Sequence, residues 1–388
     1  MKSSNRIIFV PFIAALGGVE RLILDLSTFL HERGVAHTVV CFRQELDLQS
    51  YSDLPLEVCE LRPMRTPLLE AQALKNYLRS SPGFAEYAPL LFDLKSAFYS
   101  GLASAGPFVL HLTDPPSLLP ADISKHAPSV KKHLGGAHDG QGRAGRLSAE
   151  IVHRVNRRGA RRASKLIAMT EKIRAELRSL YDVDAVVIRP GVTTATLEDR
   201  TLAADRSSAF RILSVSRLEP SKRIDWILKA LATIDEKVDG TTPNWRFEIA
   251  GEGSETASLK RLAIDLGLQD RTSFLGHLRN EELAAAYART HLFVMPAVQG
   301  YGLPALEALS RSIPIIVHKD SGVSEILKGN PWVEIVDGNG SSLSRAISAM
   351  MGRVAGDALE TCERPKVPTS SDWAKHISVE CGWLTSAV

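Results

Sequence analysis

A glycine-containing turn that leads into a helix carries the clearest chemical signal in this chain. It occupies residues 298–309 and directly follows the apolar run 291–296, which is typical of a buried strand. Leu303 and Pro304 open a helix-forming segment, and the free backbone amides of a first helical turn can bind a phosphate. Glu307 follows one turn later and can accept hydrogen bonds from sugar hydroxyls. The stretch predicts a site for a nucleotide diphosphate and its ribose, with simple helix–strand packing as the alternative.

A second turn carries two cations that could serve the same ligand. Arg217 and Lys222 are five residues apart, just after the strand predicted at 211–215. Across a tight turn both can face one anion, because the guanidinium offers a planar fork for phosphate oxygens and the ammonium is a point charge. A solvated surface turn is the alternative. Since both turns follow strands of one predicted domain, we interpret them as parts of one anion site.

Alternating strands and helices must position these turns. The predicted strands are 6–13, 37–42, 56–61, 88–93, 107–112, 165–169 and 185–189, then 211–215, 246–250, 272–275, 291–295, 313–317 and 332–336. Strands separated by helices predict parallel sheets covered on both faces, and the polar stretch 193–208 reads as a linker. The sequence thus predicts an α/β protein with two tandem Rossmann-like doubly wound parallel sheets, in domains 1–192 and 193–370. A ligand cleft between the domains is expected.

Five short motifs occur in the order seen in glycosyltransferase family 4, which this chain resembles over nearly its whole length. They are Gly17-Gly18-Val19-Glu20-Arg21, Val215-Ser216-Arg217-Leu218 with Lys222, Ile249-Ala250-Gly251-Glu252-Gly253, Phe274-Leu275-Gly276-His277-Leu278, and Gly300-Tyr301-Gly302-Leu303-Pro304-Ala305-Leu306-Glu307-Ala308. The resemblance is strong over 211–327 and weaker over 43–160. It implies the GT-B fold and retaining sugar transfer from a nucleotide diphosphate sugar. It also implies that a C-terminal helix in 371–388, anchored by Trp373, completes the first domain.

The resemblance further implies roles for individual donor-binding residues. They are Arg217 and Lys222 for the diphosphate, the backbone of Gly302 and Leu303 for a phosphate, Glu307 for the ribose hydroxyls, Gly17 and Gly18 for close approach of donor phosphates and acceptor, and His277 and Leu278 for the base. A side chain at either glycine of the first-domain loop would obstruct that approach.

Two positions depart from the family pattern. The family's loop usually begins with a glutamate eight residues before the ribose carboxylate, and Gln299 occupies that position here. An amide can still hydrogen-bond sugar hydroxyls but lacks the negative charge that could stabilise an oxocarbenium-like transition state. Where many members have a sugar-contacting histidine, this chain has Thr113, which leaves His111 or Asp114 as the polar contact. The alternative is a histidine held in a strand and an aspartate that caps a turn.

Composition excludes several function classes. The chain of 388 residues has 47 basic and 44 acidic residues and a net charge of +3, so a general nucleic-acid binder is not expected. Its four cysteines show no metal-ligand spacing, which disfavours a disulfide scaffold and a structural zinc site. The apolar run near the N-terminus continues into a charged helix, so a first strand and helix explain it better than a signal peptide. We therefore expect a cytoplasmic protein.

Three other segments admit a functional and a plain interpretation. The glycine-rich, basic segment 135–146 reads as a mobile loop over the acceptor site or as disorder. Asp182-Val183-Asp184 looks like a metal-binding DxD motif but lies between a helix end and an edge-like strand, so no metal site is expected. The dense basic run 153–162 suggests a solvated surface that could also contact anionic lipids at the inner membrane.

These observations predict a metal-independent, retaining glycosyltransferase whose catalytic candidates are Arg217, Lys222, Gln299, His111 and Asp114. The expected donor is a nucleotide diphosphate sugar of unidentified base, with no further cofactor. The expected acceptor is a saccharide or lipid-linked saccharide of surface polysaccharide or lipopolysaccharide synthesis. One alternative is a non-catalytic sugar-nucleotide-binding partner subunit whose active site is degenerate at Gln299 and Thr113. An epimerase on the same architecture is another, although its acid–base set is not identifiable.

Overall fold

The structure, a computed structural model, describes residues 6–118 (without 63, 85 and 105), 143–193, 209–235, 244–338, 340–363 and 366–385. Contacts within the chain divide it into two units. Unit 1 comprises Met1–Pro190 and Pro368–Val388, and unit 2 comprises Gly191–Val367. The boundaries expected from the sequence, at 192 and 370, lie close to these.

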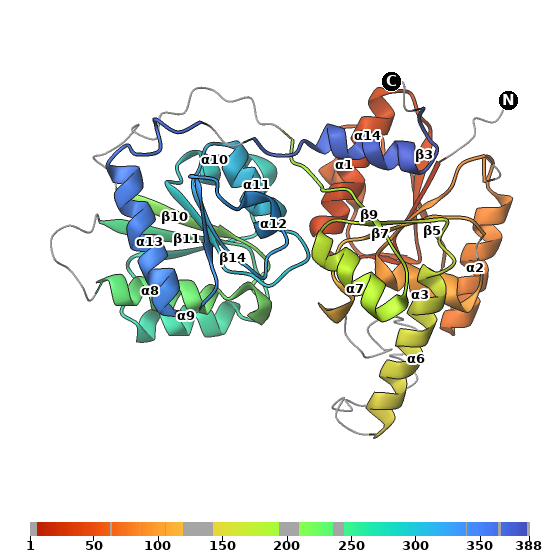
Figure 1. Ribbon diagram of the computed structural model, residues 1–388, viewed down its shortest axis with the longest axis horizontal. Coiled ribbons are helices and arrows are strands. Elements are labelled where there is room, and N and C mark those ends of the chain that lie inside the picture. Colours follow the sequence, from red (N-terminus) through yellow and green to blue (C-terminus); the bar gives the residue numbers. More distant parts are fainter. Residues whose placement is uncertain are drawn as a thin grey trace. The chain divides into compact units, whose positions relative to one another are not determined.

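Unit 1 is a parallel sheet with helices on both faces (Figure 1). The strand order is β5-β3-β1-β6-β7-β8-β9, and all neighbouring strands run parallel. The strands are β1 (Arg6–Phe9), β3 (His37–Cys41), β5 (Val58–Glu60), β6 (Leu90–Phe92), β7 (Val109–Leu112), β8 (Lys165–Ala168) and β9 (Val186–Val187), with a separate pair β2 (Phe12–Ile13) and β4 (Arg43–Gln44). The helices are α1 (Gly18–Glu32), α2 (Pro67–Ser80), α3 (Asp93–Leu102), α6 (Arg143–Ala160), α7 (Glu171–Tyr181) and α14 (Ser370–Glu380). Helices α1 and α14 pack together on one face, and α2, α3, α6 and α7 cover the other.

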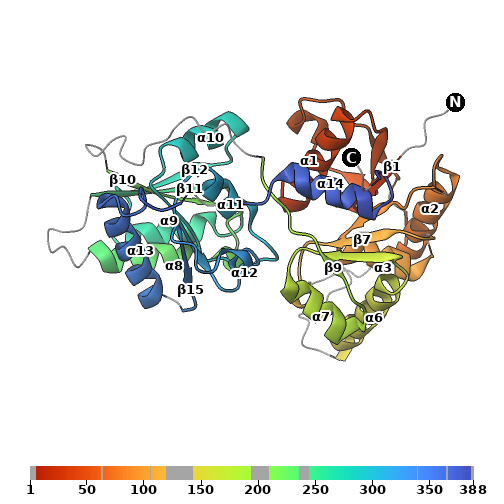
Figure 2. The same ribbon diagram turned by 45° about the horizontal axis from the view of Figure 1, so that its top comes forward.

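Unit 2 repeats this architecture with the strand order β12-β11-β10-β13-β14-β15, again all parallel. The strands are β10 (Phe210–Val215), β11 (Trp245–Ala250), β12 (Thr272–Gly276), β13 (Leu292–Met295), β14 (Ile315–His318) and β15 (Val333–Val336). The helices are α8 (Ile224–Asp235), α9 (Thr256–Asp265), α10 (Asn280–Ala288), α11 (Leu303–Ser310), α12 (Ser324–Leu327) and α13 (Gly340–Ala355). Helices α8, α9 and α13 cover one face of the sheet, and α10 and α11 lie on the other (Figures 1 and 2).

The local sequence explains these elements. Strands β13 and β14 are buried at every position, as expected for strands of a parallel sheet that is covered on both faces. Helix α2 is capped by Thr66, whose side chain accepts from the N–H of Leu69, and has Pro67 in its first turn. Thr170 caps α7 in the same way. Sequence periodicity and capping residues therefore locate most elements.

The expectation of two doubly wound parallel sheets is confirmed. Most strands are shorter than their predicted ranges because only part of each apolar run forms ladder hydrogen bonds. The β2–β4 pair and the short helix α12 were not expected. The linker 193–208 lies outside the described residues except for residue 193, and so does the segment 135–146 except for 143–146, which begin α6. The cleft between the domains stays a prediction.

Candidate functional site

The candidate donor site lies at the centre of the sheet of unit 2. From β10 the chain adds β11 and β12 toward one edge of the sheet, and from β13 it adds β14 and β15 toward the other edge. Because β10 and β13 are paired, the loops that follow them are neighbours at the carboxyl ends of the strands. Ligands bind at such a switch point in open parallel sheets. Arg217 and Lys222 belong to the first loop, and Gln299 and Gly302 to the second.

Two glycines hold the loop after β10 against the loop after β11. Leu218 N–H donates to Glu252 O at 2.9 Å. A Cβ built on Gly251 would lie 1.9 Å from Ser216 O, and one on Gly253 would lie 2.3 Å from Leu218 O. Both distances are far below any normal contact, so only glycine permits this approach. The motif thus fixes the start of the turn that carries the two cations.

The two cations have different surroundings. The Arg217 side chain is 62% exposed, and its Nη1 lies 3.0 Å from Glu219 Oε1. Exposed ion pairs of this kind are weak, so the guanidinium can exchange its partner for a phosphate. Lys222 ends the short 3-10 helix Pro220–Lys222, and its Nζ donates to Gln299 Oε1 at 2.9 Å. Lys222 therefore joins the loops that follow β10 and β13.

Arg223 supports this arrangement, although sequence analysis did not single it out. Its φ of +53° is unusual for a residue other than glycine. Its Nη2 lies 3.0 Å from Asp320 Oδ2, its Nη1 donates to Pro296 O at 3.4 Å, and its Cζ lies 4.2 Å from the centre of the Trp226 ring. These contacts fix the residue that follows Lys222 and restrict where the lysine can point.

Gln299 is held by its whole amide group. While Oε1 accepts from Lys222, Nε2 donates to Ser321 Oγ at 3.3 Å and contacts Met295 Sδ at 3.1 Å. The amide lies against Gly302, where a Cβ would be 2.6 Å from Gln299 Nε2 and 2.8 Å from Met295 Cε. Gly302 also has a φ of +128°. Glycine is therefore required there by both space and backbone conformation.

The start of α11 offers backbone donors. Gly302 is its N-cap residue, Ala305 N–H donates to Gly302 O at 3.1 Å, and Pro304 has no N–H. Within the part of the chain that the structure describes, the N–H groups of Gly302 and Leu303 donate to no acceptor. These two donors and the positive end of the helix dipole can bind an anion.

A buried tyrosine orients Glu307. Tyr287, which is 1% exposed, donates from its hydroxyl to Glu307 Oε2 at 2.9 Å and to Pro304 O at 3.3 Å. The Arg311 guanidinium lies over the Tyr287 ring, 4.8 Å from its centre, and donates to Glu307 O at 2.7 Å. Sequence reasoning missed Tyr287 because a tyrosine in an alanine-rich helix reads as a packing residue. Its hydroxyl restricts the carboxylate expected to meet the ribose.

The expected base-contacting residues lie further along the same edge of the sheet. His277 and Leu278 follow Gly276, which ends β12 with a φ of +68°. His277 is exposed and Leu278 is half-buried. Since β11 separates β12 from β10, the pair lies at the carboxyl edge but not beside the cations. Their contact with a base stays a prediction.

In unit 1 the two glycines after β2 differ in what they require. Gly17 is the N-cap residue of α1, and its N–H donates to Glu20 Oε2 at 3.0 Å. A Cβ on Gly17 would lie 2.9 Å from the same oxygen, whereas a Cβ on Gly18 would meet no atom within 4 Å. The fold explains Gly17 but not Gly18. Open space at Gly18 is consistent with the expected close approach of a ligand.

His111 lies in the core rather than in a site. Its side chain is 0% exposed, and its ring packs against Phe92 and edge-on against Trp373, with centroid distances of 5.1 and 5.7 Å. Neither ring nitrogen has a partner among the described residues. Burial lowers the pKa of His111 to about 3, so the ring is neutral. An enclosed neutral ring cannot contact a substrate, which corrects the expectation that His111 could be catalytic.

The polar groups at the end of β7 are instead Thr113 and Asp114. Asp114 is exposed. Thr113 is 7% exposed, and both its N–H and its hydroxyl donate to Asp93 Oδ1, the first at 3.3 Å. Asp93 begins α3 directly after β6. Sequence analysis missed it because one aspartate between a strand and a helix reads as a helix cap.

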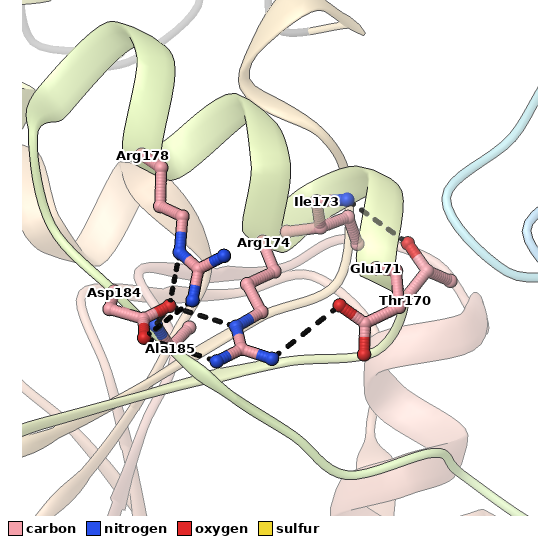
Figure 3. A network of polar contacts seen from close by, with 7 residues as sticks. All are labelled: Thr170, Glu171, Ile173, Arg174, Arg178, Asp184 and Ala185. Atoms are coloured by element: carbon pink, nitrogen blue, oxygen red, sulfur yellow. Dashed lines mark hydrogen bonds and ion pairs between the residues drawn. The ribbon is translucent and has the colours of Figure 1, made fainter.

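The DxD-like motif is part of an ion-pair network (Figure 3). Asp184 Oδ1 lies 2.8 Å from the Nε of Arg174 and of Arg178, and their Nη2 atoms approach Oδ2 at 3.1 and 2.8 Å. These guanidinium groups hold the pKa of Asp184 well below its usual range. Asp182 is paired with Arg161. Both carboxylates are thus engaged, and the described residues contain no cluster of three or more His, Cys, Asp or Glu that could hold a metal ion.

Several arginines of the basic run 153–162 are used inside unit 1. Arg157 and Arg161 donate from Nε to Tyr181 O at 3.3 and 3.1 Å, and Arg162 donates to Ser100 O at 2.8 Å. They fasten α6 and the turn after it to neighbouring helices. Of the helices described, none has the length and apolarity needed to cross a membrane.

Comparisons with known proteins match both units. The family model described as "Glycosyl transferases group 1" matches residues 201–351, and that of "Glycosyltransferase Family 4" matches residues 16–196. A GDP-mannose-dependent alpha-(1-6)-phosphatidylinositol monomannoside mannosyltransferase of Mycobacterium tuberculosis is 31% identical over 176 residues, 42% of this chain and 44% of that protein. D-inositol 3-phosphate glycosyltransferase of Streptomyces scabiei is 28% identical over 253 residues, 58% of this chain and 52% of that protein. The chain thus spans about half the length of these curated relatives.

Solved structures share the fold over almost the whole chain. HepE of Anabaena in complex with UDP-glucose has a TM-score of 0.68 at 17% identity, covering 98% of this chain and 100% of that one. WaaG, a glycosyltransferase involved in lipopolysaccharide biosynthesis, has a TM-score of 0.65 at 16% identity, covering 96% and 95%. At these identities the likeness shows the two-domain GT-B fold alone.

Proposed function

This chain belongs to the group 1 glycosyltransferases of glycosyltransferase family 4, and we propose that it transfers a sugar from a nucleotide diphosphate donor with retention of configuration and without a metal ion. The observation that carries the proposal is the 2.9 Å contact between Lys222 and Gln299. This contact joins the Lys222 ammonium to the loop that leads into α11. A cation and the first backbone amides of α11, both suited to a diphosphate, therefore belong to neighbouring loops at the switch point.

Each donor group has a candidate partner in unit 2. The diphosphate would be neutralised by two side chains, Lys222 and Arg217, and by the N–H groups of Gly302 and Leu303. Glu307, oriented by Tyr287, would accept hydrogen bonds from the ribose hydroxyls. Carboxylates oriented in this way bind hydroxyls without rearranging first, which favours affinity.

Chemistry would consist of breaking the bond between the anomeric carbon and the phosphate oxygen while an acceptor hydroxyl attacks on the same face. The departing phosphate oxygen would take the acceptor proton. Negative charge on the diphosphate grows in the transition state, and Lys222 and the helix amides would stabilise it there. Preorganised donors of this kind are commonly worth about 3 kcal/mol each.

The acceptor that we propose is a saccharide or a lipid-linked saccharide of surface polysaccharide or lipopolysaccharide synthesis. Two of the proteins named above support this acceptor class: one is named as a phosphatidylinositol monomannoside mannosyltransferase, and the other is involved in lipopolysaccharide biosynthesis. Action on such acceptors would place the protein in the cytoplasm at the inner face of the membrane. Exposed side chains of the basic run 153–162 would supply attraction to anionic lipids.

A donor panel tests the proposal. The full chain is incubated with UDP-, GDP- and ADP-hexoses and a set of saccharide acceptors, with and without EDTA, and nucleotide diphosphate release is measured. We expect release from at least one donor, undiminished by EDTA, and a product with the donor's anomeric configuration by NMR. Inversion, dependence on a metal ion, or no release and no nucleotide binding would each contradict part of the proposal.

The competing possibility is a sugar-nucleotide-binding subunit without catalysis. The contacts of Gln299 favour a working glutamine, because Oε1 accepts from Lys222 while Nε2 donates to Ser321. A glutamate would keep the first contact but have no proton for the second. Gln299→Glu should therefore reduce existing activity. Activity created from none would instead identify a degenerate site.

A further inference from the structure

Asp93 occupies an unusual position in unit 1. Strand β6 ends at Phe92 and α3 begins at Asp93, so the chain turns from strand to helix without a loop. The turn is made with a φ of +67° at Asp93. Such a backbone is costly for a residue with a side chain, and it is often found where a functional group must be presented.

The carboxylate of Asp93 is half engaged. Oδ1 accepts both from the Thr113 N–H, at 3.3 Å, and from the Thr113 hydroxyl. Among the described residues, Oδ2 has no hydrogen-bond partner. Asp93 as a whole is partly exposed. Because the Thr113 hydroxyl donates to Oδ1, Oδ2 is left as a hydrogen-bond acceptor, which suits a sugar hydroxyl.

The place of Asp93 in the sheet is that of a ligand site. In the order β5-β3-β1-β6-β7-β8-β9, β6 is flanked by β1 and β7. The chain runs from β1 through β3 to β5 at one edge of the sheet, and from β6 through β7 and β8 to β9 at the other. Asp93 therefore lies at the switch point of unit 1, between the loop that leads from β1 to Gly18 and the end of β7 at Thr113. Thr113 itself replaces the histidine that the family resemblance leads one to expect.

We propose that Asp93 Oδ2 binds a hydroxyl of the saccharide acceptor and that Thr113 is its positioning residue. The inference rests on the proposed function. Unit 2 supplies candidate partners for the diphosphate and the ribose of the donor, whereas the glycines of unit 1 are expected to meet the acceptor as well as the donor phosphates, so we assign the saccharide acceptor to this unit.

The charge state of Asp93 is consistent with this role. Burial raises the pKa of Asp93 to about 6, and the nearby Asp114 carboxylate adds to this increase. The Thr113 hydrogen bonds and Lys95 act in the opposite direction. The side chain is thus a charged acceptor at neutral pH and becomes protonated near pH 5. Acceptor binding should weaken over that interval.

Asp93→Asn is the informative variant. Asparagine tolerates positive φ, and its Oδ1 can still accept from both Thr113 donors, so the fold should persist. Only the oxygen offered to the ligand is replaced, by an NH2 group. Asp182→Asn is the matched control, because Asp182 is also an aspartate of unit 1 with positive φ, 56°, and lies in no proposed site.

Binding of methyl glycosides of glucose, galactose, mannose and N-acetylglucosamine is measured on the full chain by saturation-transfer NMR, and binding of UDP, GDP and ADP by calorimetry. We expect Asp93→Asn to weaken glycoside binding about tenfold, with unchanged nucleotide affinity and no decrease in unfolding temperature. The wild type should lose glycoside binding between pH 7 and 5, and the variant should not. Asp182→Asn should match the wild type.

Other outcomes separate the failure of this inference from that of the proposed function. Unchanged glycoside binding in Asp93→Asn, or no glycoside binding by a wild type that binds a nucleotide, overturns the role of Asp93 and leaves the donor site intact. A variant with a lower unfolding temperature and weaker binding of both ligand types would show a purely structural role, which also overturns it. A wild type that binds glycosides but no nucleotide contradicts the donor site instead.

Discussion

Lys222 Nζ donates to Gln299 Oε1 at 2.9 Å, across 77 residues of sequence, and so connects the loops that follow β10 and β13. The amide oxygen of Gln299 adds no counter-charge to the Lys222 ammonium and fixes its direction. Gln299, which departs from the family pattern, is thus in direct contact with Lys222, the residue expected to bind the departing diphosphate.

Gly302→Ala should destabilise unit 2 strongly. The new Cβ would meet Gln299 Nε2 at 2.6 Å, and the residue would keep a φ of +128°. Strain and overlap together should cost about 2 kcal/mol or more. Gly267→Ala is the control, since Gly267 has a φ of +70° but nothing within 4 Å of its Cβ, and should cost about 1 kcal/mol. Urea unfolding measures both, and equal losses would show that the overlap at Gly302 is relieved by side-chain movement.

Gly18→Ala should separate stability from function. Because a Cβ at Gly18 meets no protein atom and alanine favours helices, the variant should be as stable as the wild type or up to about 1 kcal/mol more stable. If donor phosphates or the acceptor approach this backbone closely, turnover should nevertheless fall. Thermal unfolding and nucleotide release are measured on the same preparation. Unchanged turnover would mean that no ligand approaches Gly18.

Tyr287→Phe should weaken nucleotide binding. Removal of the hydroxyl that donates to Glu307 at 2.9 Å frees the carboxylate to rotate, which should raise the Kd of the nucleotide about fivefold. Tyr99→Phe is the control, because Tyr99 also donates to a carboxylate, Glu70, at 3.1 Å, but in unit 1. It should lower stability and leave the Kd unchanged. Calorimetry decides, and equal effects of the two variants would argue against a role for Tyr287 in the site.

Stability should depend on pH through Asp93. Its pKa is raised from 3.8 to about 6, so the folded chain holds this proton more tightly than the unfolded chain. The contribution of Asp93 to the free energy of unfolding therefore falls between pH 4 and pH 6, by at most about 3 kcal/mol, and stays low above that. Asp93→Asn should raise the urea midpoint of unit 1 at pH 7.5 and leave it nearly unchanged at pH 4. A variant that is less stable at pH 7.5 would contradict this sign.

The sequence predicted what depends on local pattern. Apolar runs located the strands, and the glycines and prolines of the turns located the ends that carry Lys222 and Glu307. It did not predict the partners, because Tyr287 reaches Glu307 across 20 residues and Arg223 reaches Asp320 across 97. Such contacts exist only once the sheet has formed.

Residues at strand ends show the same limit in unit 1. His111 and Thr113 lie two residues apart at the end of β7. The sequence alone does not show that the His111 ring is enclosed by Phe92 and Trp373. Asp93 carried no signal at all, because its importance lies in a backbone angle and in a partner on the neighbouring strand.

The most direct test of the account is the turnover of Lys222→Ala with the donor that the wild type uses, measured as nucleotide diphosphate release. Loss of the ammonium should lower turnover roughly a hundredfold, since it removes a charge that stabilises the departing diphosphate. Lys229→Ala, which removes an exposed lysine paired with Asp225 at 2.8 Å on α8, should keep the wild-type rate. A Lys222→Ala rate close to that of the wild type would contradict the central claim that this residue stabilises the leaving group.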